Sequence, residues 1–169
     1  MAPGQPERER VPVYLSGLLL AARQVVVVGG GAVALRRVTG LLDAAAQVVV
    51  VAPELVPRLR ELVHAGRVSW QARPYRDGDL EGAWYAVTAT GDPGVDVAVA
   101  AEAERRRVFC VRTDSSREGS ALTPATGAVR GLIVGVLSAG GQADPRRAAA
   151  ARSVIVAAVE AGLPGIPPA

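Results

Sequence analysis

The chain has 169 residues, half of them hydrophobic and about a fifth charged, so its length fits one globular domain with a short appendage and its composition excludes disorder over the whole length. All 19 basic residues are arginines, the net charge is +3 at pH 7 and aromatic residues make up 4%, which argues against nucleic acid as a partner and suits an acidic small molecule. No arginine-free apolar run is long enough to cross a bilayer, a single cysteine forms no intrachain disulfide, and no signal-peptide core is visible near the start. We therefore expect a cytoplasmic protein without membrane contact.

Short valine-rich runs alternate with helical patterns through the first two thirds of the chain. Strands are expected over residues 25–28, 48–51, 68–72, 84–88 and 108–112, and helices over 32–45, 54–65 and 95–107. Strands that are apolar on both faces and that alternate with helices predict a parallel sheet covered on two sides. The expected fold class is α/β, with a doubly wound parallel sheet of the Rossmann type.

The pattern changes after Thr113. Residues 114–127 are polar, and they precede one further expected strand over 132–137 and an alanine-rich helix over 145–161. The two ends have the composition of a flexible leader and of a linker or tail. The sequence thus predicts four parts: a leader over 1–10, a dinucleotide-binding domain over 11–113, a second segment over 114–161 and a tail over 162–169.

Three glycines follow the first valine-rich run. The stretch Gly29-Gly30-Gly31-Ala32-Val33-Ala34 matches G-x-G-x-x-A between a strand and a helix, which is the context that the dinucleotide fingerprint requires. Gly29 would permit a tight turn, Gly31 would let the backbone touch a pyrophosphate, and Ala34 would keep the helix close to the sheet. The alternative is that the glycines only form a tight strand-to-helix turn.

Glu54 and Asp114 are acidic residues at positions where the fold would let them contact a ligand. Glu54 follows the second strand, roughly 20 residues after the fingerprint, where an acidic side chain binds the ribose hydroxyl of NAD and repels the phosphate of NADP. The equally open alternative is a glutamate that begins a helix and interacts with its dipole. Asp114 would emerge at the carboxyl end of the last parallel strand, the edge where such sheets bind ligands, and could serve as a base. Its alternative is a turn-forming Asp-Ser-Ser cluster.

No resident metal site is expected. His64 and Cys110 are too few to form a tight nitrogen and sulfur site, and we expect His64 near a helix C-terminus and Cys110 in the core. Ser138 precedes two glycines and no histidine lies nearby in the sequence, so a turn is the simpler interpretation than a nucleophile.

Several linked motifs together resemble the precorrin-2 dehydrogenases, which also form the N-terminal module of siroheme synthases. The motifs are Tyr14-Leu15, VVVVGGGAVALRR, VVVVAPE, Arg73-Pro74-Tyr75, Thr88-Ala89-Thr90-Gly91-Asp92, the run from Ala100 to Cys110, and Ser138-Ala139-Gly140-Gly141. The resemblance covers roughly residues 11–150. It implies NAD-dependent oxidation of precorrin-2 to sirohydrochlorin in siroheme biosynthesis, on a Rossmann domain followed by a dimerisation segment, in a homodimer.

The resemblance also assigns site residues. The expected cofactor contacts are Gly29, Gly30, Gly31, Ala32, Val33, Pro53, Glu54 and Thr90, and Asp114 matches the aspartate that the family uses for catalysis. The tetrapyrrole substrate bears many carboxylates, which arginine binds well. The expected substrate-binding residues are Arg112, Arg117, Ser138 and Arg146, with Arg130 and Arg147 as further candidates.

Two alternatives stay open. One is a bifunctional enzyme that also inserts ferrous iron into sirohydrochlorin, and the other is a dinucleotide-sensing domain without catalysis. Many relatives read G-G-x-S-P where this chain has Gly140-Gly141-Gln142-Ala143-Asp144-Pro145, and they continue through a further helical region. This departure puts iron insertion and the full substrate cleft in doubt. A methyltransferase domain could follow in the full-length protein.

Overall fold

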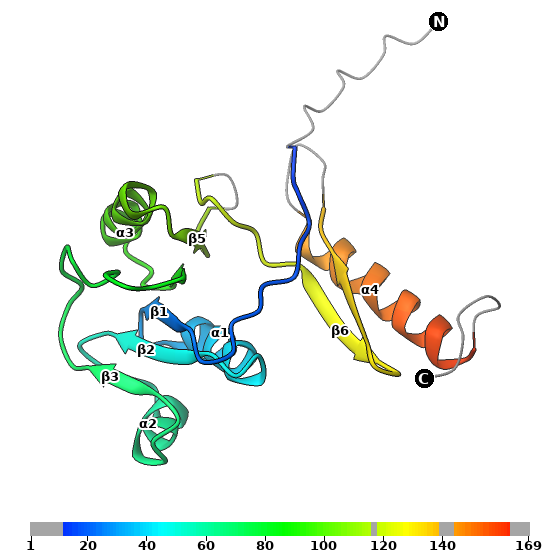
Figure 1. Ribbon diagram of the computed structural model, residues 1–169, viewed down its shortest axis with the longest axis horizontal. Helices are drawn as coiled ribbons and strands as arrows, with labels where there is room; N and C mark the ends of the chain where they lie inside the picture. Colours follow the sequence, from blue (N-terminus) through cyan, green and yellow to red (C-terminus); the bar gives the residue numbers. More distant parts are fainter. Residues whose placement is uncertain (1–11, 116–117, 139–143, 163–169) are drawn as a thin grey trace, which may run out of the picture. The chain divides into compact units, whose positions relative to one another are not determined.

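A five-stranded parallel sheet organises the first part of the chain (Figure 1). The computed structural model describes residues 12–115, 118–138 and 144–162. The strands of the sheet are β1 (Gln24–Val28), β2 (Gln47–Val51), β3 (Ser69–Gln71), β4 (Tyr85–Thr88) and β5 (Phe109–Arg112). They lie in the order β3-β2-β1-β4-β5, and each neighbouring pair is parallel. The predicted α/β fold of the Rossmann type is confirmed.

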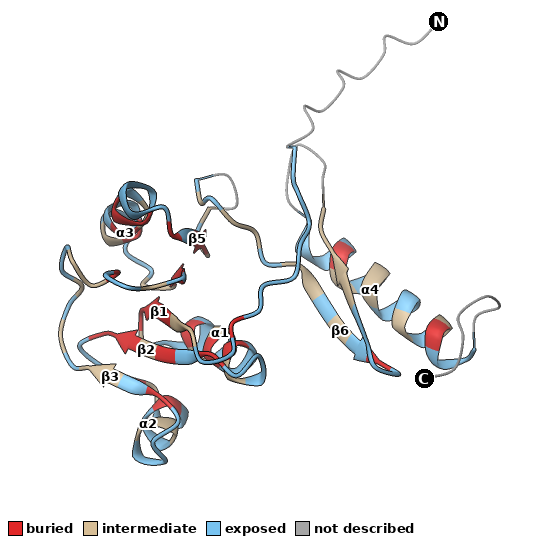
Figure 2. Ribbon diagram, in the orientation of Figure 1, coloured by how far each residue is buried: buried red, intermediate tan, exposed pale blue. Residues whose placement is uncertain are grey.

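Three helices connect the strands: α1 (Ala32–Asp43), α2 (Pro57–His64) and α3 (Pro93–Arg106). Successive side chains of a strand point to opposite faces of the sheet. Val25 and Val27 accordingly pack in one core together with residues of α1 and α2, whereas Val26 and Val28 pack in a second core with residues of α3. Figure 2 shows the buried residues concentrated on these strands. Burial on two faces explains why the strands read as runs of valine.

The order of the strands reverses at β1. Its neighbours are β2 on one side and β4 on the other, and the two halves of the sheet are reached through different helices. Ligands of open α/β sheets bind beyond the carboxyl ends of the strands at such a switch point. The glycine loop begins directly after β1, at this position.

Two helices begin at other residues than the sequence predicts. α2 begins at Pro57 after an N-cap at Val56, because proline fits the first turn of a helix, so the prediction of a helix from residue 54 is wrong. Glu54 therefore lies in the loop before α2 and is no helix-start residue. α3 begins at Pro93, two residues before the expected start, and Asp92 caps it.

The chain divides into two compact units, one formed by Gly17–Leu122 and one by Met1–Ser16 with Thr123–Ala169. The first unit thus extends beyond residue 113, where the sequence pattern changes. The leader over 1–10 and all of the tail except Gly162 lie outside the described residues. Within the described ranges, no helix has the length and apolar character needed to cross a membrane.

The second unit is a hairpin and a helix. β6 (Ala125–Val129) and β7 (Leu132–Val136) pair antiparallel, and α4 (Pro145–Glu160) packs on them. β7 and α4 match the expected strand and helix, but β6 is not among the predicted strands, because residues 114–127 read as a polar stretch. A side chain at Gly127 would place its Cβ 2.8 Å from Val156 Cγ2, so glycine lets α4 approach the strand.

Candidate functional site

A cleft of about 530 Å³ lies at the switch point of the sheet. Four segments line it: the glycine loop after β1, the loop between β2 and α2, a Pro-Tyr pair after β3, and the turn between β4 and α3. The lining residues are Val28, Gly29, Gly30, Gly31, Val51, Ala52, Pro53, Glu54, Leu55, Val56, Pro74, Tyr75, Thr90 and Val95.

The glycines of the loop are required for different reasons. Gly29 has φ +123°, and a Cβ there would lie 2.2 Å from the carbonyl oxygen of Ala89. A Cβ on Gly30 would lie 1.9 Å from the carbonyl oxygen of Glu54. Neither reason applies to Gly31, whose φ of −87° suits any residue and whose Cβ would meet no atom within 4 Å. A tight turn accounts for Gly29 and Gly30 but not for Gly31.

Gly31 is also the N-cap of α1, and no side chain caps this helix. The first N–H groups of a helix have no partner within the helix, and together with the helix dipole they favour an anion. Open space beside Gly31 and uncapped N–H groups in a cleft are the features that a pyrophosphate needs. The loop therefore fits a dinucleotide.

Most of the expected cofactor contacts meet in this cleft. Gly29, Gly30 and Gly31 form one wall, and Pro53, Glu54 and Thr90 belong to others. The side chains of Pro53 and Glu54 are exposed. Ala32 and Val33 lie in the first turn of α1, exposed, and are not among the lining residues.

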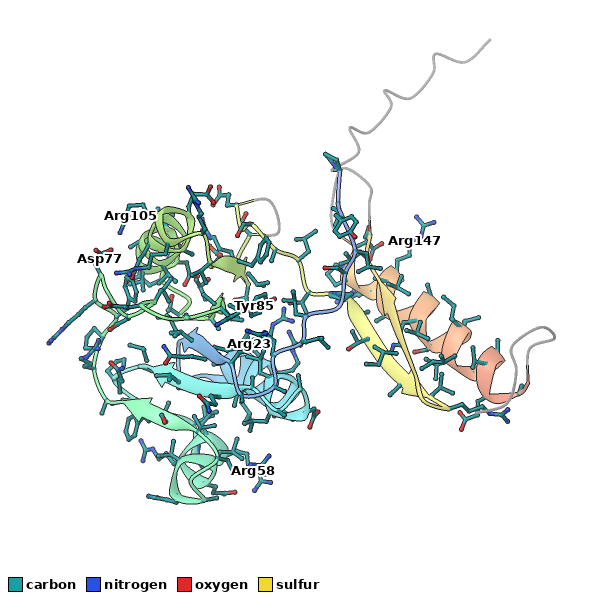
Figure 3. All side chains as sticks on the ribbon, viewed as in Figure 1. Arg23, Arg58, Asp77, Tyr85, Arg105 and Arg147 are labelled. Atoms are coloured by element: carbon teal, nitrogen blue, oxygen red, sulfur yellow. The ribbon has the colours of Figure 1, made fainter. Side chains whose placement is uncertain are left out.

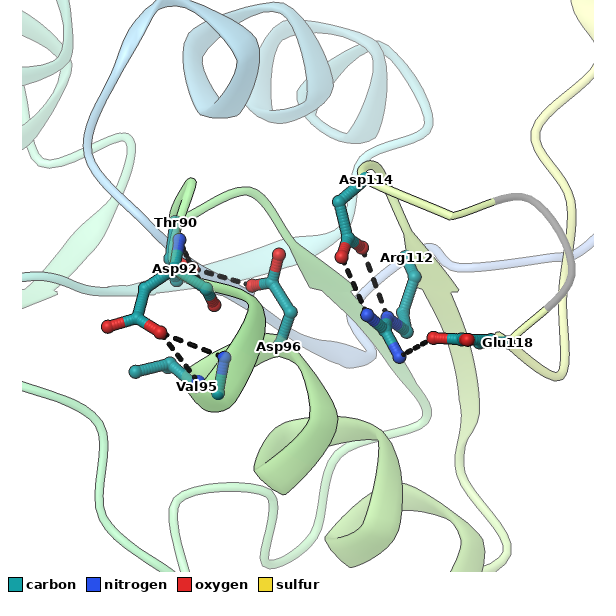
Figure 4. A network of polar contacts seen from close by, with 8 residues as sticks. Thr90, Asp92, Val95, Asp96, Arg112, Asp114 and Glu118 are labelled. Atoms are coloured by element: carbon teal, nitrogen blue, oxygen red, sulfur yellow. Dashed lines mark hydrogen bonds and ion pairs between the residues drawn. The ribbon is translucent and has the colours of Figure 1, made fainter.

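Hydrogen bonds fix the turn that carries Thr90 (Figure 4). Thr90 Oγ1 donates to Asp96 Oδ1 at 2.6 Å and accepts from the backbone N–H of Asp92 at 3.0 Å. Asp92 Oδ1 in turn accepts from the N–H groups of Gly94 and Val95, which caps α3. Asp96 is completely buried, and sequence reasoning missed its contact with Thr90 because no local pattern reveals it.

A buried glutamate of α3 supports the wall formed by Tyr75. Glu102 accepts hydrogen bonds from the Tyr75 hydroxyl, from the backbone N–H of Leu80 at 3.3 Å and from Arg106 Nε at 2.6 Å. Burial raises its pKa, but these bonds and one from the backbone of Gly78 outweigh burial, so the pKa of Glu102 lies below its ordinary value. Burial and the bond to Glu102 raise the pKa of the Tyr75 phenol. Glu102 thus ties the segment between β3 and β4 to α3, a contact that sequence reasoning also missed.

Asp114 follows β5, the strand next to β4, and lies beside Arg112 (Figure 4). It is not among the residues that line the cleft. Arg112 Nε donates to its Oδ1 at 3.0 Å and Arg112 Nη2 to its Oδ2 at 2.6 Å. The hydrogen bonds from Arg112, which outweigh the opposing effect of burial, lower the pKa of Asp114. Asp114 is therefore a carboxylate at neutral pH, held at the carboxyl edge of the sheet.

The expected substrate-binding residues lie in different places. Arg112 is buried and bonded to Asp114 and Glu118, whereas Arg117 lies outside the described residues. In the second unit, Ser138 is half-buried after β7 and Arg146 is exposed in the first turn of α4. Of the further candidates, Arg147 is exposed on α4, and Arg130 donates to the carbonyl oxygen of Glu160 at 2.9 Å.

The two residues considered for metal binding lie where the sequence predicts. His64 is exposed in the last turn of α2. Cys110 is buried in β5, and burial raises the pKa of its thiol to about 11. Residues 12–115, 118–138 and 144–162 contain no group of three or more His, Cys, Asp or Glu side chains that could hold a metal ion.

The fold and the cleft define a dinucleotide-binding protein of the Rossmann class. A family model described as "Putative NAD(P)-binding" matches residues 18–125, and the chain belongs to this family.

Similar proteins carry a more specific description. The chain is 39% identical over 121 residues to siroheme synthase 1 of Aeromonas hydrophila, covering 72% of this chain and 26% of that protein. It is 37% identical over 132 residues to the siroheme synthase of Chromobacterium violaceum, covering 78% of this chain and 27% of that protein. The solved structure of SirC, precorrin-2 dehydrogenase, matches with a TM-score of 0.70 and 25% identity, over 86% of this chain and 70% of that chain. The resemblance to precorrin-2 dehydrogenases and siroheme synthases is confirmed, and the chain spans about a quarter of the length of these siroheme synthases.

Proposed function

We propose that this chain is an NAD-dependent dehydrogenase that oxidises precorrin-2 to sirohydrochlorin. The observation that carries the proposal is Gly31, where no protein atom requires the absence of a side chain and a dinucleotide does. The likeness to siroheme synthases and to a precorrin-2 dehydrogenase supplies the substrate. The reaction belongs to siroheme biosynthesis.

The cleft holds the cofactor through two groups of residues. The backbone of Gly29–Gly31 and the first turn of α1 bind the pyrophosphate, and Glu54 accepts a hydrogen bond from the adenosine ribose. A carboxylate at this position repels a ribose phosphate, which favours NAD over NADP. When bound, NAD accepts a hydride.

Asp114 acts on the substrate. Oxidation of precorrin-2 removes a hydride and a proton, and positive charge develops on the tetrapyrrole as the hydride departs. A carboxylate that stays ionised stabilises this charge and then accepts the proton. An aspartate is ionised at neutral pH at its ordinary pKa of about 3.9, and Arg112 lowers the pKa of Asp114 further.

The test is a dehydrogenase assay without oxygen. The purified chain, given precorrin-2 and NAD, should form sirohydrochlorin and NADH in equal amounts. Asp114→Asn should lower kcat by about a hundredfold or more, as the loss of an acid–base group does, while the Kd for NAD stays the same. The matched control is Asp77→Asn, which removes an exposed carboxylate paired with Arg105 (Figure 3) and should leave kcat unchanged.

Two further measurements, NAD binding and iron insertion, separate the alternatives. NAD binding without any oxidation of precorrin-2 would replace the dehydrogenase by a dinucleotide-sensing domain. Faster iron insertion into sirohydrochlorin than in the absence of protein would add a ferrochelatase activity.

The second unit is proposed to form a homodimer. The hairpin and α4 expose large apolar side chains, among them Ile133, 83% exposed, and Val154, 70% exposed. Apolar surface of this kind favours association with another protein surface. The chain matches about a quarter of the length of the siroheme synthases, which supports the proposal of a fusion to a methyltransferase domain in the full-length protein. We also propose that the reaction takes place in the cytoplasm.

A further inference from the structure

We propose that Arg112 is a positioning residue, which holds the carboxylate of Asp114 in one orientation at the carboxyl edge of the sheet. The catalytic part of this inference rests on the proposed function, in which Asp114 acts on the substrate. The sequence suggested another role for Arg112, a direct contact with substrate carboxylates.

The geometry of the pair is that of a fork. Two parallel hydrogen bonds, of 3.0 and 2.6 Å, join Nε and Nη2 of Arg112 to the two oxygens of Asp114 (Figure 4). A planar guanidinium that binds both oxygens fixes the plane of the carboxylate, which a single bond does not. The side chain of Arg112 is 5% exposed, whereas that of Asp114 is 27% exposed. The anchor is therefore buried, and the carboxylate that it holds remains accessible.

The surroundings fix Arg112 itself. Its backbone pairs with Thr88 of β4, and its third nitrogen, Nη1, donates to Glu118. The buried carboxylate of Asp96 on α3 also acts on the guanidinium through its negative charge. The buried guanidinium is thus paired directly with two carboxylates, those of Asp114 and Glu118, as a buried charge requires.

The same contacts argue against a direct grip on substrate. Nε, Nη1 and Nη2 of Arg112 all donate to carboxylates of this chain. The two N–H groups that remain on Nη1 and Nη2 belong to a side chain that is 5% exposed, so little of Arg112 is accessible to a substrate carboxylate. Arg112 accordingly acts through Asp114.

The test combines NMR titration with kinetics on the full chain. The carboxyl carbon of Asp114 is titrated in the wild type, in Arg112→Gln and in Arg112→Lys, and kcat and the Kd for NAD are measured beside it. We expect Arg112→Gln to raise the pKa of Asp114 and to lower kcat at least tenfold, with an unchanged Kd. Arg112→Lys should restore much of the pKa but not kcat, since it returns the charge without the fork. Arg105→Gln, which removes the exposed pair with Asp77, should change none of these values.

Each possible result either supports or overturns the proposed role of Arg112. A folded Arg112→Gln protein with the wild-type kcat, or with an unchanged pKa at Asp114, would overturn it. If Arg112→Gln does not fold, Arg112→Lys decides, because a wild-type kcat in that variant would show that the fork is not needed. If the wild type fails to oxidise precorrin-2, the proposed function fails, while the titration still shows whether Arg112 holds the carboxylate of Asp114.

Discussion

Glu54 stands at the wall of the cleft with its side chain exposed, between the end of β2 and the start of α2. Its place in the sequence predicts a contact with ribose, and the structure removes the competing interpretation as a helix-start residue. The side chain of Glu54 is therefore free to serve a ligand.

Replacement of this carboxylate should change the choice of cofactor. In Glu54→Ser, the ratio of the Kd for NADP to the Kd for NAD should fall by about tenfold or more, because two like charges no longer repel each other at the ribose. Binding titrations with the two cofactors measure the ratio. Glu61→Ser removes an exposed glutamate of α2, paired with Arg58, and serves as the control. An unchanged ratio in Glu54→Ser would show that Glu54 does not contact the ribose.

Residue types and spacing were sufficient for the glycine loop but not for the contacts of single side chains. Gly31 could be identified because the fingerprint is local in the sequence. The bond between Tyr75 and Glu102 could not, since these partners are 27 residues apart and meet only after α3 packs on the sheet. The bond between Thr90 and Asp96 spans six residues and depends on the conformation of the turn before α3. The short ion pair of Arg112 with Asp114 was missed because its geometry depends on the end of β5.

At the scale of elements, the single helix α3 supports two separate walls of the cleft. Its first turn supports Thr90 in the cleft, and Glu102 in its second half supports the segment with Tyr75. The helix thus stabilises two walls of the cleft from below the surface.

Loss of the Glu102 charge should destabilise the fold in a pH-dependent manner. Glu102→Gln should lower the free energy of unfolding at pH 7 by about 2–4 kcal/mol, because it breaks hydrogen bonds to a buried carboxylate and leaves Arg106 without its partner. Since the folded-state pKa is lowered, the carboxylate stabilises the fold fully above its unfolded-state pKa of about 4.3, and this effect is lost as the pH falls through the folded-state value. Urea denaturation at several pH values measures the difference.

The expected result is a difference between wild type and Glu102→Gln that is constant near neutral pH and shrinks below about pH 4. A difference in the free energy of unfolding that grows on acidification would contradict a lowered pKa of Glu102. Glu104→Gln, an exposed glutamate on the same helix, is the matched control and should have little effect on stability.

The sheet was the most predictable part of the molecule. Buried parallel strands produce runs of valine that no other element of this chain resembles, so β1 and β2 could be placed almost to the residue. β6 could not be placed, because close packing with α4 selects small residues such as Gly127 that do not indicate a strand. The alternation of half-buried and exposed residues along β6 follows from packing against α4 and not from strand propensity.

At the scale of the whole molecule, the chain consists of two compact units that carry different features. The Gly17–Leu122 unit contains the cleft and Asp114, and the second unit exposes apolar side chains on its hairpin and on α4. We propose that nucleotide binding belongs to the first unit and association with a second copy to the second unit.

The proposed dimer should depend on the second unit. We expect the wild type to sediment as a dimer and Ile133→Asp to shift it to the monomer, because a charge would be buried in an apolar contact. Val97→Asp changes an apolar residue of α3 that is 52% exposed and should leave the dimer intact. A monomeric wild type, or a dimer that Val97→Asp disrupts and Ile133→Asp does not, would remove the assignment.

The most direct measurement is a calorimetric titration of NAD into the wild type and into Gly31→Ala. The added methyl group meets no protein atom and φ is ordinary, so the free energy of unfolding should change by no more than about 1 kcal/mol. The same methyl group would occupy the space of the pyrophosphate, so NAD should bind at least tenfold more weakly to Gly31→Ala. Equal affinity of the two proteins for NAD would contradict the placement of the dinucleotide beside Gly31 and with it the proposed function.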